Sequence, residues 1–206
     1  QLEENILADG VIISPIIVWG DVIIDGHNRF RIAQKHPHIE FTTCERKFYD
    51  RHEALAWICK NQLGQRNLTF RQKKYLIGKQ YESEKASHGG DRKSNEVKSS
   101  SQVGNLISPE KTCDRIANEY GISKNSVLRA GAFSKAVDIA DEIDPGIRSE
   151  IFAGKIKPTQ DDVDAITKAT PEERPALVEE LRKPPEERKR LLPERHLLTL
   201  EEIAAE

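Results

Sequence analysis

The sequence predicts an α+β domain followed by an all-α domain and a helical tail. Short β-branched runs are concentrated between residues 11 and 44, and helical periodicity dominates after residue 50. A segment rich in Gly, Ser and charged residues separates the two helical parts. We therefore divide the chain into residues 1–85, an α+β domain with a small mixed sheet and helices; residues 86–111, a flexible basic linker or loop; residues 112–167, an all-α domain; and residues 168–206, a charged helical tail.

The first domain is predicted to contain a β-hairpin. Apolar runs at residues 16–18 and 22–24 flank residues 19–21, a turn of hairpin length. A helix over residues 27–35 stops before the next proline, and residues 40–44 resume the alternation of a strand. Two longer helices follow.

These two helices are predicted over residues 51–63 and from residue 69 to about residue 85.

Three cysteines are spread along the chain without C-x-x-C spacing, which argues for reduced thiols and against a disulfide framework or a zinc site. We expect Cys44 and Cys59 to be inert thiols in buried, apolar surroundings.

The composition favours a soluble, helix-rich protein. Charged residues make up 32% of the chain, the mean hydropathy is −0.62, and no apolar run approaches the roughly 20 residues needed to cross a bilayer. We expect a cytoplasmic protein without a membrane partner.

Charge is distributed unevenly along the chain. Residues 60–135 hold 15 Lys and Arg and 7 Asp and Glu, whereas residues 136–206 hold 11 Lys and Arg and 18 Asp and Glu. The basic middle suggests a polyanionic partner, although solvated helix faces would give the same balance.

A possible anion site lies where the hairpin meets the helix at residue 27. Asp25-Gly26 ends a β-branched run, and the helix opens at once. Gly26 can adopt backbone angles closed to other residues, and the first N–H groups of a helix attract an anion. Basic and polar side chains stand beside this turn, which suggests a phosphate: His27, Asn28, Arg29 and Arg31.

The most specific motif lies at residues 112–133. Thr112 is predicted to cap a first helix, Gly121 to end it in a left-handed conformation, and Ser123 to cap a second helix. Ile122 would fill the corner between them. Apolar side chains would join the two helices: Ile116, Ala117, Tyr120, Val127 and Leu128. This spacing is that of a helix-turn-helix, and the alternative is a plain helical hairpin.

A helix-turn-helix would present the start of its second helix to the major groove of DNA. The polar residues there are predicted to read base edges: Lys124, Asn125, Ser126 and Arg129. Other basic residues are predicted to contact phosphates and position the duplex: Arg92, Lys93, Lys111 and Arg115.

Two further helices are predicted after this motif. Residues 146–153 would end at Gly154, and Thr159 would cap residues 160–167 with Asp162 in a capping box. We expect this acidic pair to support the preceding helices. In the tail, prolines at 171 and 185 would each open a short helix, which we interpret as a spacer or a docking element for a partner protein, not as part of a core.

The order of these parts resembles the ParB family of bacterial and plasmid partition proteins. The matching segments are residues 15–18, 24–33 and 61–69, followed by the helix-turn-helix, so that the resemblance covers residues 1 to about 167. It implies a ParB/sulfiredoxin-like N-terminal domain, CTP with Mg²⁺ as cofactor, and a dimeric clamp on DNA. The stretch at residues 88–94 resembles mobile-element and phage relatives.

By this resemblance, Gly26, His27, Asn28 and Arg29 would form the phosphate turn. A second nucleotide contact would come from a later segment: Asn61, Gln62, Gln65 and Arg66. The sequence departs from the family pattern at Asn28, which replaces an arginine, and at His27, which replaces a glutamate. The change at Asn28 removes one charge from the triphosphate site.

Two enzymatic functions are alternatives to DNA binding. Sulfiredoxin-like chemistry needs a cysteine in the Gly26 turn, and no cysteine lies within fifteen residues of it. A nucleotide-dependent enzyme (NTP hydrolysis or phosphotransfer) would use Asp25, His27 or Glu53 as a base, but each of these has an ordinary structural explanation. We assign no catalytic and no metal-binding residue.

The sequence therefore predicts a sequence-specific, nucleoid-associated protein of the ParB type. We expect double-stranded DNA as its partner and a homodimer as its assembly, because a single reading helix has a small footprint. Plasmid or chromosome partition and mobile-element regulation are both compatible with this prediction.

Overall fold

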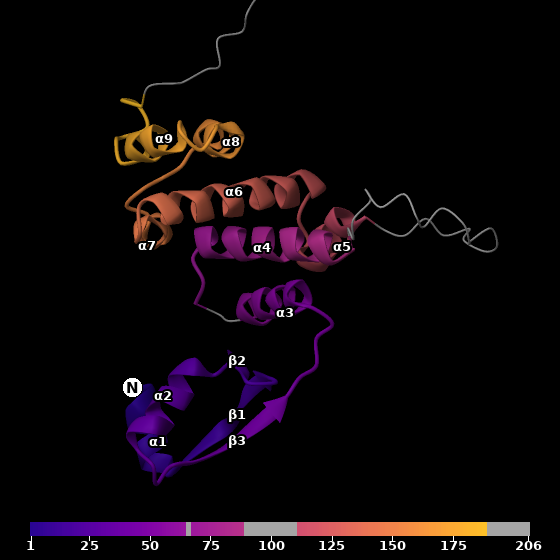
Figure 1. The fold of residues 1–206 in the computed structure, drawn as a ribbon, viewed down its shortest axis with the longest axis vertical. Coiled ribbons are helices and arrows are strands. Elements are labelled where there is room, and N and C mark those ends of the chain that lie inside the picture. Colours follow the sequence, from indigo (N-terminus) through magenta and orange to yellow (C-terminus); the bar gives the residue numbers. More distant parts are fainter. Residues whose placement is uncertain (65–66, 89–110, 189–206) are drawn as a thin grey trace, which may run out of the picture.

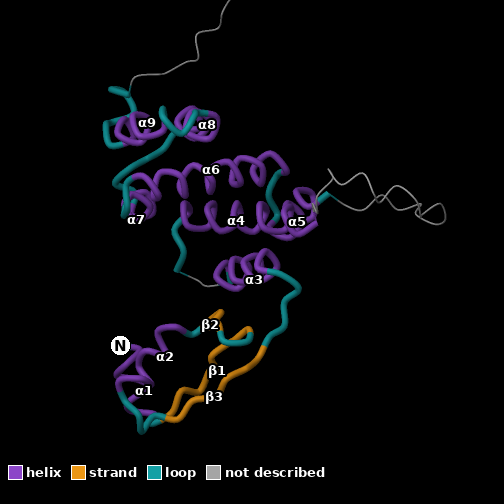
Figure 2. Tube along the Cα trace, viewed as in Figure 1, coloured by secondary structure: helices purple, strands orange, loops and turns teal. Residues whose placement is uncertain are grey.

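The computed structural model describes residues 1–64, 67–88 and 111–188, and within them the fold is mixed α+β and mostly helical (Figure 1). A three-stranded sheet with two helices forms one end of the molecule. A layer of longer helices forms the middle, and short helices form the other end (Figure 2). None of the helices within the described ranges is long and apolar enough to cross a membrane.

The sheet is built around a central strand, β1 (Val11–Trp19). β2 (Val22–Asp25) pairs with it antiparallel, with Trp19 opposite Val22, which confirms the predicted hairpin. β3 (Glu40–Glu45) pairs parallel on the other side of β1. The connection between β2 and β3 is α2 (His27–Lys35), as predicted.

A small apolar core joins the sheet to its helices. The first of these, α1 (Leu2–Asp9), was not predicted from the sequence. His36 after α2 lies 2.9 Å from a carboxylate oxygen of Glu3 in α1, which links the two helices. Buried apolar side chains from α1, β1, α2 and the loop that follows make up the core: Ile6, Ile12, Ile32, Ala33 and Ile39.

α3 (Arg51–Leu63) and α4 (Phe70–His88) lead from the sheet into the helical part. The predicted bounds of α3 are confirmed. Asp50 caps it by accepting a 2.7 Å hydrogen bond from the Glu53 N–H. α4 lies between α3 and α6 (Lys124–Ile143), so it joins the layer beside the sheet domain to the later helices (Figure 1).

α4 and α6 cross at very short range. The Gly78 Cα faces the backbone of Ala130, so that a Cβ at position 78 would overlap the Ala130 carbonyl. Gly131 of α6 lies against the Tyr81 ring. Small residues on both helices thus allow backbone-to-backbone contact.

The remaining helices are α5 (Thr112–Tyr120), α7 (Ile147–Ala153), α8 (Gln160–Lys168) and α9 (Arg174–Leu181). The predicted capping box of Thr159 and Asp162 is confirmed, and α7 ends at Gly154 as predicted, in a left-handed conformation.

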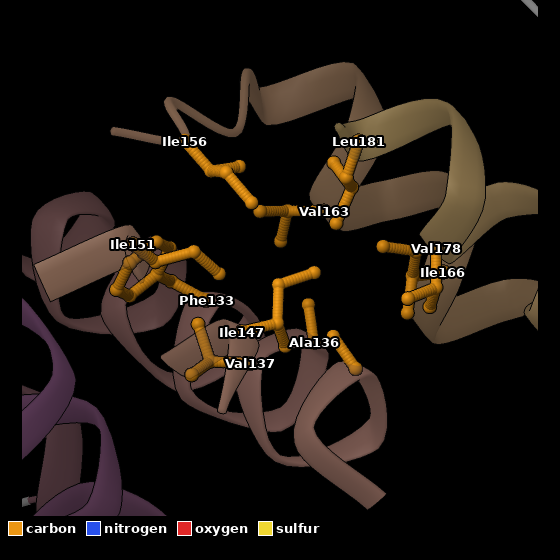
Figure 3. Packing of buried hydrophobic residues seen from close by; sticks show 11 residues of the cluster. Phe133, Ala136, Val137, Ile147, Ile151, Ile156, Val163, Ile166, Val178 and Leu181 are labelled. Atoms are coloured by element: carbon orange, nitrogen blue, oxygen red, sulfur yellow. The ribbon is translucent and has the colours of Figure 1, made fainter. Parts of the chain in front are cut away.

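We define the C-terminal core as the buried cluster in which α6, α7, α8 and α9 meet (Figure 3). Val178 and Leu181 of α9 are 1% and 2% exposed within it. The interpretation of the tail as a spacer outside any core is therefore wrong for α9. Pro171 precedes this helix instead of opening it, and Pro185 lies in a turn. Buried apolar side chains form the C-terminal core: Phe133, Ala136, Val137, Ala140, Ile147, Ile151, Ile156, Val163, Ile166, Val178 and Leu181.

Candidate nucleic-acid interface

The turn between α5 and α6 has the predicted backbone geometry. Gly121 ends α5 with φ 63° and ψ 34°, the left-handed conformation that glycine adopts without steric cost. The Ile122 N–H then donates to the Ala117 carbonyl at 3.0 Å. Ser123 caps α6, because its Oγ accepts a 3.2 Å hydrogen bond from the Ser126 N–H. The direction in which α6 leaves the corner is thus set by local hydrogen bonds.

A buried apolar cluster holds α5 against α6. Ile116 and Val127 are fully buried, and Ala117 and Cys113 are nearly so. Ile77 and Tyr81 of α4 pack against the same cluster, so three helices support the corner. Two local predictions are wrong. Lys111, not Thr112, is the N-cap of α5. Leu128 is 40% exposed, because it lies one position past the buried Val127.

The predicted reading residues lie together on the first two turns of α6. Lys124, Asn125, Ser126 and Arg129 are all exposed. The Lys124 Nζ is 3.4 Å from a carboxylate oxygen of Asp114, and both side chains are well exposed. Such a surface pair is weak and can exchange for another anion. The face is therefore polar, accessible and close to the positive end of a helix dipole.

Lys74 of α4 lies beside this face and was missed from the sequence. Its Nζ is 4.6 Å from the centroid of the Phe133 ring, which places the ammonium group over α6. In the sequence Lys74 is one of many lysines on a charged helix. Only the antiparallel packing of α4 on α6 distinguishes Lys74 from the other lysines of α4.

Arg115, predicted to contact phosphate, is instead held by carboxylates. It pairs with Glu84 of α4 and lies 3.8 Å from Glu119. Lys60 of α3 pairs with Glu119 at 2.5 Å, so this acid also binds a cation of α3. The predicted phosphate contact Lys111 is exposed, whereas Arg92 and Lys93 lie outside the described residues.

These charges surround a buried amide. Gln80 is completely buried, donates to Glu84 at 3.0 Å and accepts from the Tyr120 hydroxyl at 2.8 Å. Burial, followed by the nearby Glu119 carboxylate, raises the pKa of Tyr120 to about 12, so its hydroxyl stays protonated and donates. This polar network of Lys60, Gln80, Glu84, Arg115, Glu119 and Tyr120 connects α3, α4 and α5.

A cavity of about 270 Å³ opens beside the polar network. One wall is aromatic, with the Phe48 and Trp57 rings 5.9 Å apart and the Arg46 guanidinium 4.8 Å from the Trp57 ring centroid. Lys60 and Arg115 also line the cavity. None of the described residues predicted to bind nucleotide lines this cavity.

The Gly26 turn has the expected backbone conformation, but Arg29 is paired within the protein. Gly26 has φ 98°, and a Cβ there would lie 3.2–3.3 Å from the Arg29 guanidinium and the Ile16 Cα. Arg29 pairs with Asp25 at 3.1 Å and donates to the Ser14 carbonyl at 3.1 Å. Its charge thus holds the strand to the helix, while His27 and Asn28 are exposed.

The second predicted nucleotide contact is described only in part. Asn61 is exposed and Gln62 is half-buried near the end of α3, whereas Gln65 and Arg66 lie outside the described residues. Nucleotide binding at the Gly26 turn, with CTP or another NTP, stays a prediction. Calorimetry with CTP, ATP and GTP on the full chain would test it.

The cysteines differ in their surroundings. Cys59 is buried, and burial raises the pKa of its thiol to about 11, as expected for an inert residue. Cys44 is exposed on the edge strand β3, so the prediction of a buried thiol is wrong there. In the part of the chain that the structure describes, no three His, Cys, Asp or Glu side chains gather in a way that could hold a metal ion.

The chain was compared with models of protein families and with curated proteins, and neither comparison gives a match.

Proposed function

We propose that this protein binds double-stranded DNA in a sequence-specific manner, with the start of α6 in the major groove. One observation carries the proposal: Lys124, Asn125 and Ser126 are exposed on the first turn of a helix whose corner is fixed by Gly121 and Ser123. Side chains of this kind, held on a rigid helix end, can bond base edges and phosphates.

The packing behind the corner supports this proposal. Val127 points from the first turns of α6 into the α4–α5 cluster, while the neighbouring polar residues point to solvent. A plain helical hairpin would have the same buried side chains and would also expose polar residues. The gathering of Lys124, Asn125 and Ser126 on the capped first turn of α6 is what favours a DNA-binding helix. The exposed Lys111 at the N-cap of α5 would add a phosphate contact.

We further propose a ParB type of function in partition or in mobile-element regulation, with the protein acting as a homodimer. The chain order of a small mixed sheet, then α3 and α4, then the α5–α6 corner, is compatible with that type. A dimer would place two reading helices on two half-sites, which raises specificity above that of one helix.

The test is selection of duplexes from a random pool, followed by fluorescence anisotropy on the selected and a scrambled duplex. Asn125→Ala should reduce discrimination between the two by about 1–3 kcal/mol, the usual value of a good amide–base contact. Lys124→Ala should weaken binding to both. The matched control is Lys168→Ala, because Lys168 is 80% exposed at the far end of α8.

Equal affinity of the wild-type protein for all duplexes would reject sequence-specific reading. Binding that Asn125→Ala and Lys124→Ala both leave at the level of the control would show that another surface binds DNA.

A further inference from the structure

Lys74 carries a positive charge that is half-buried beside another positive charge. Its side chain extends over the Phe133 ring, and Arg129 lies one helical turn before Phe133 on the same face of α6. Burial and, next, the charge of Arg129 lower the pKa of Lys74. The two cations therefore face the same small region between α4 and α6.

Two other cations of these helices are neutralised across the interface. Lys79 of α4 pairs with Asp138 of α6 at 2.8 Å, and Lys135 of α6 pairs with Glu82 of α4 at 2.7 Å. Within residues 1–64, 67–88 and 111–188, Lys74 and Arg129 have no carboxylate partner. Repulsion between the two cations and the partial desolvation of Lys74 raise the free energy of this arrangement unless an anion binds between them.

We propose that Lys74 and Arg129 together clamp one phosphodiester group of the DNA backbone at the edge of the groove that α6 enters. This inference rests on the proposed function. It adds α4 to the DNA-binding surface and assigns Arg129 a backbone contact in place of a base contact. An oxyanion between the two side chains would bond both cations and remove their mutual repulsion.

The geometry is suited to a phosphate at this point. The Lys74 ammonium group lies over an aromatic ring, and this cation–π contact holds it in place before DNA arrives. Arg129 follows the exposed first turn of α6 and precedes the buried Phe133, so the pair lies beside the reading residues. A fixed backbone contact here would set how far along the groove α6 lies.

The experiment measures affinity for the selected and the scrambled duplex at several salt concentrations. Affinity falls as salt rises, and each lost phosphate contact makes the slope of log affinity against log salt shallower by about 0.9. When salt rises from 50 to 200 mM, the fold-decrease in affinity should therefore be about 3.5 times smaller for Lys74→Gln than for wild type. The loss of affinity at low salt should be the same factor for both duplexes. Lys74→Arg should keep the wild-type slope, and Lys168→Gln serves as the charge-matched control.

Double substitution of Lys74 and Arg129 by Gln should weaken binding by less than the product of the two single effects, because the residues share one phosphate. Thermal unfolding checks that each variant is folded. If Lys74→Gln is unfolded, Lys74→Met, which removes the charge from an unbranched side chain of similar length, replaces it.

The outcomes separate the two proposals. A wild-type slope in Lys74→Gln or Lys74→Met, together with lost binding in Lys124→Ala, would overturn the clamp and leave the reading helix intact. A wild-type protein that binds no duplex would reject the proposed function and the clamp with it. A slope that is lowered in Lys74→Gln or Lys74→Met but unchanged in Lys74→Arg and Lys168→Gln would support both.

Discussion

The close crossing of α4 and α6 gives a sharp prediction for Gly78→Ala. On an isolated helix this substitution is favourable, because alanine is about 1 kcal/mol better than glycine in a helix interior. In this protein the new Cβ would overlap the Ala130 carbonyl and lie 2.8 Å from the Ser134 Oγ. The carbonyl belongs to the backbone of a 20-residue helix, so the clash cannot be relieved by a side-chain rotation.

The expected magnitude follows from these two opposing effects. Overpacking of a buried contact costs about 1–3 kcal/mol, and a backbone obstacle puts Gly78→Ala at the upper end of that range. After subtraction of the gain in helix propensity, we expect the free energy of unfolding to fall by about 2 kcal/mol. For a chain of this length that corresponds to a fall in Tm of about 4–8 °C.

Thermal and urea unfolding, followed by circular dichroism, would measure this change. The control is Gly131→Ala on the opposite helix, where the new Cβ would meet the Tyr81 ring at 2.8 Å and the Glu82 carboxylate at 2.9 Å. Side chains can move aside, so Gly131→Ala should lose less stability. A Gly78→Ala protein that is more stable than wild type, or more stable than Gly131→Ala, would refute the reasoning.

Three further predictions concern stability and reactivity. The Glu53 N–H bond lowers the pKa of the Asp50 carboxyl from its ordinary value of 3.8, so the stabilisation by this cap is full above pH 3.8 and is lost as the pH falls through the lower folded pKa. In acid titrations, Asp50→Ala should therefore be less stable than wild type at neutral pH and equal to it at the lowest pH, and a constant difference would contradict the assignment. A thiol reagent at pH 8 should label Cys44 in the native protein and Cys59 only in denaturant; equal labelling rates would contradict the buried position of Cys59. Leu181→Ala should cost about 2–5 kcal/mol in urea unfolding, because this side chain is 2% exposed in the C-terminal core. The control Leu7→Ala, at a 41% exposed position, should change stability by about 0.5 kcal/mol or less, and equal effects would place α9 outside the core.

Local signals in the sequence were sufficient for most of the fold. The hairpin at Trp19, the bounds of α3 and the corner at Gly121 depend on turn residues and on periodicity within a few positions, and the structure confirms them. α1 was not predicted, and it is short, with no side chain that caps its first turn. α9 was interpreted wrongly because its burial depends on partners more than ten residues away in α8 and more than thirty residues away in α6.

The candidate site was less predictable, because it depends on which charges meet in space. The exposure of Lys124 and Asn125 follows from their place after the Ser123 cap. In contrast, the pairing of Arg115 with Glu84 and of Arg29 with Asp25 decides whether an arginine is available for phosphate. Residue type alone does not distinguish an arginine that pairs with a carboxylate of its own protein from an arginine that is free to bind a ligand.

The two ends of α6 belong to different packing units. Val127 lies in the cluster with α5, and Ala140 lies in the C-terminal core with α7 to α9. A continuous helix of 20 residues is about 30 Å long and resists bending. Because α6 is continuous, the packing of α7, α8 and α9 on its second half helps to fix the direction of its exposed first turn.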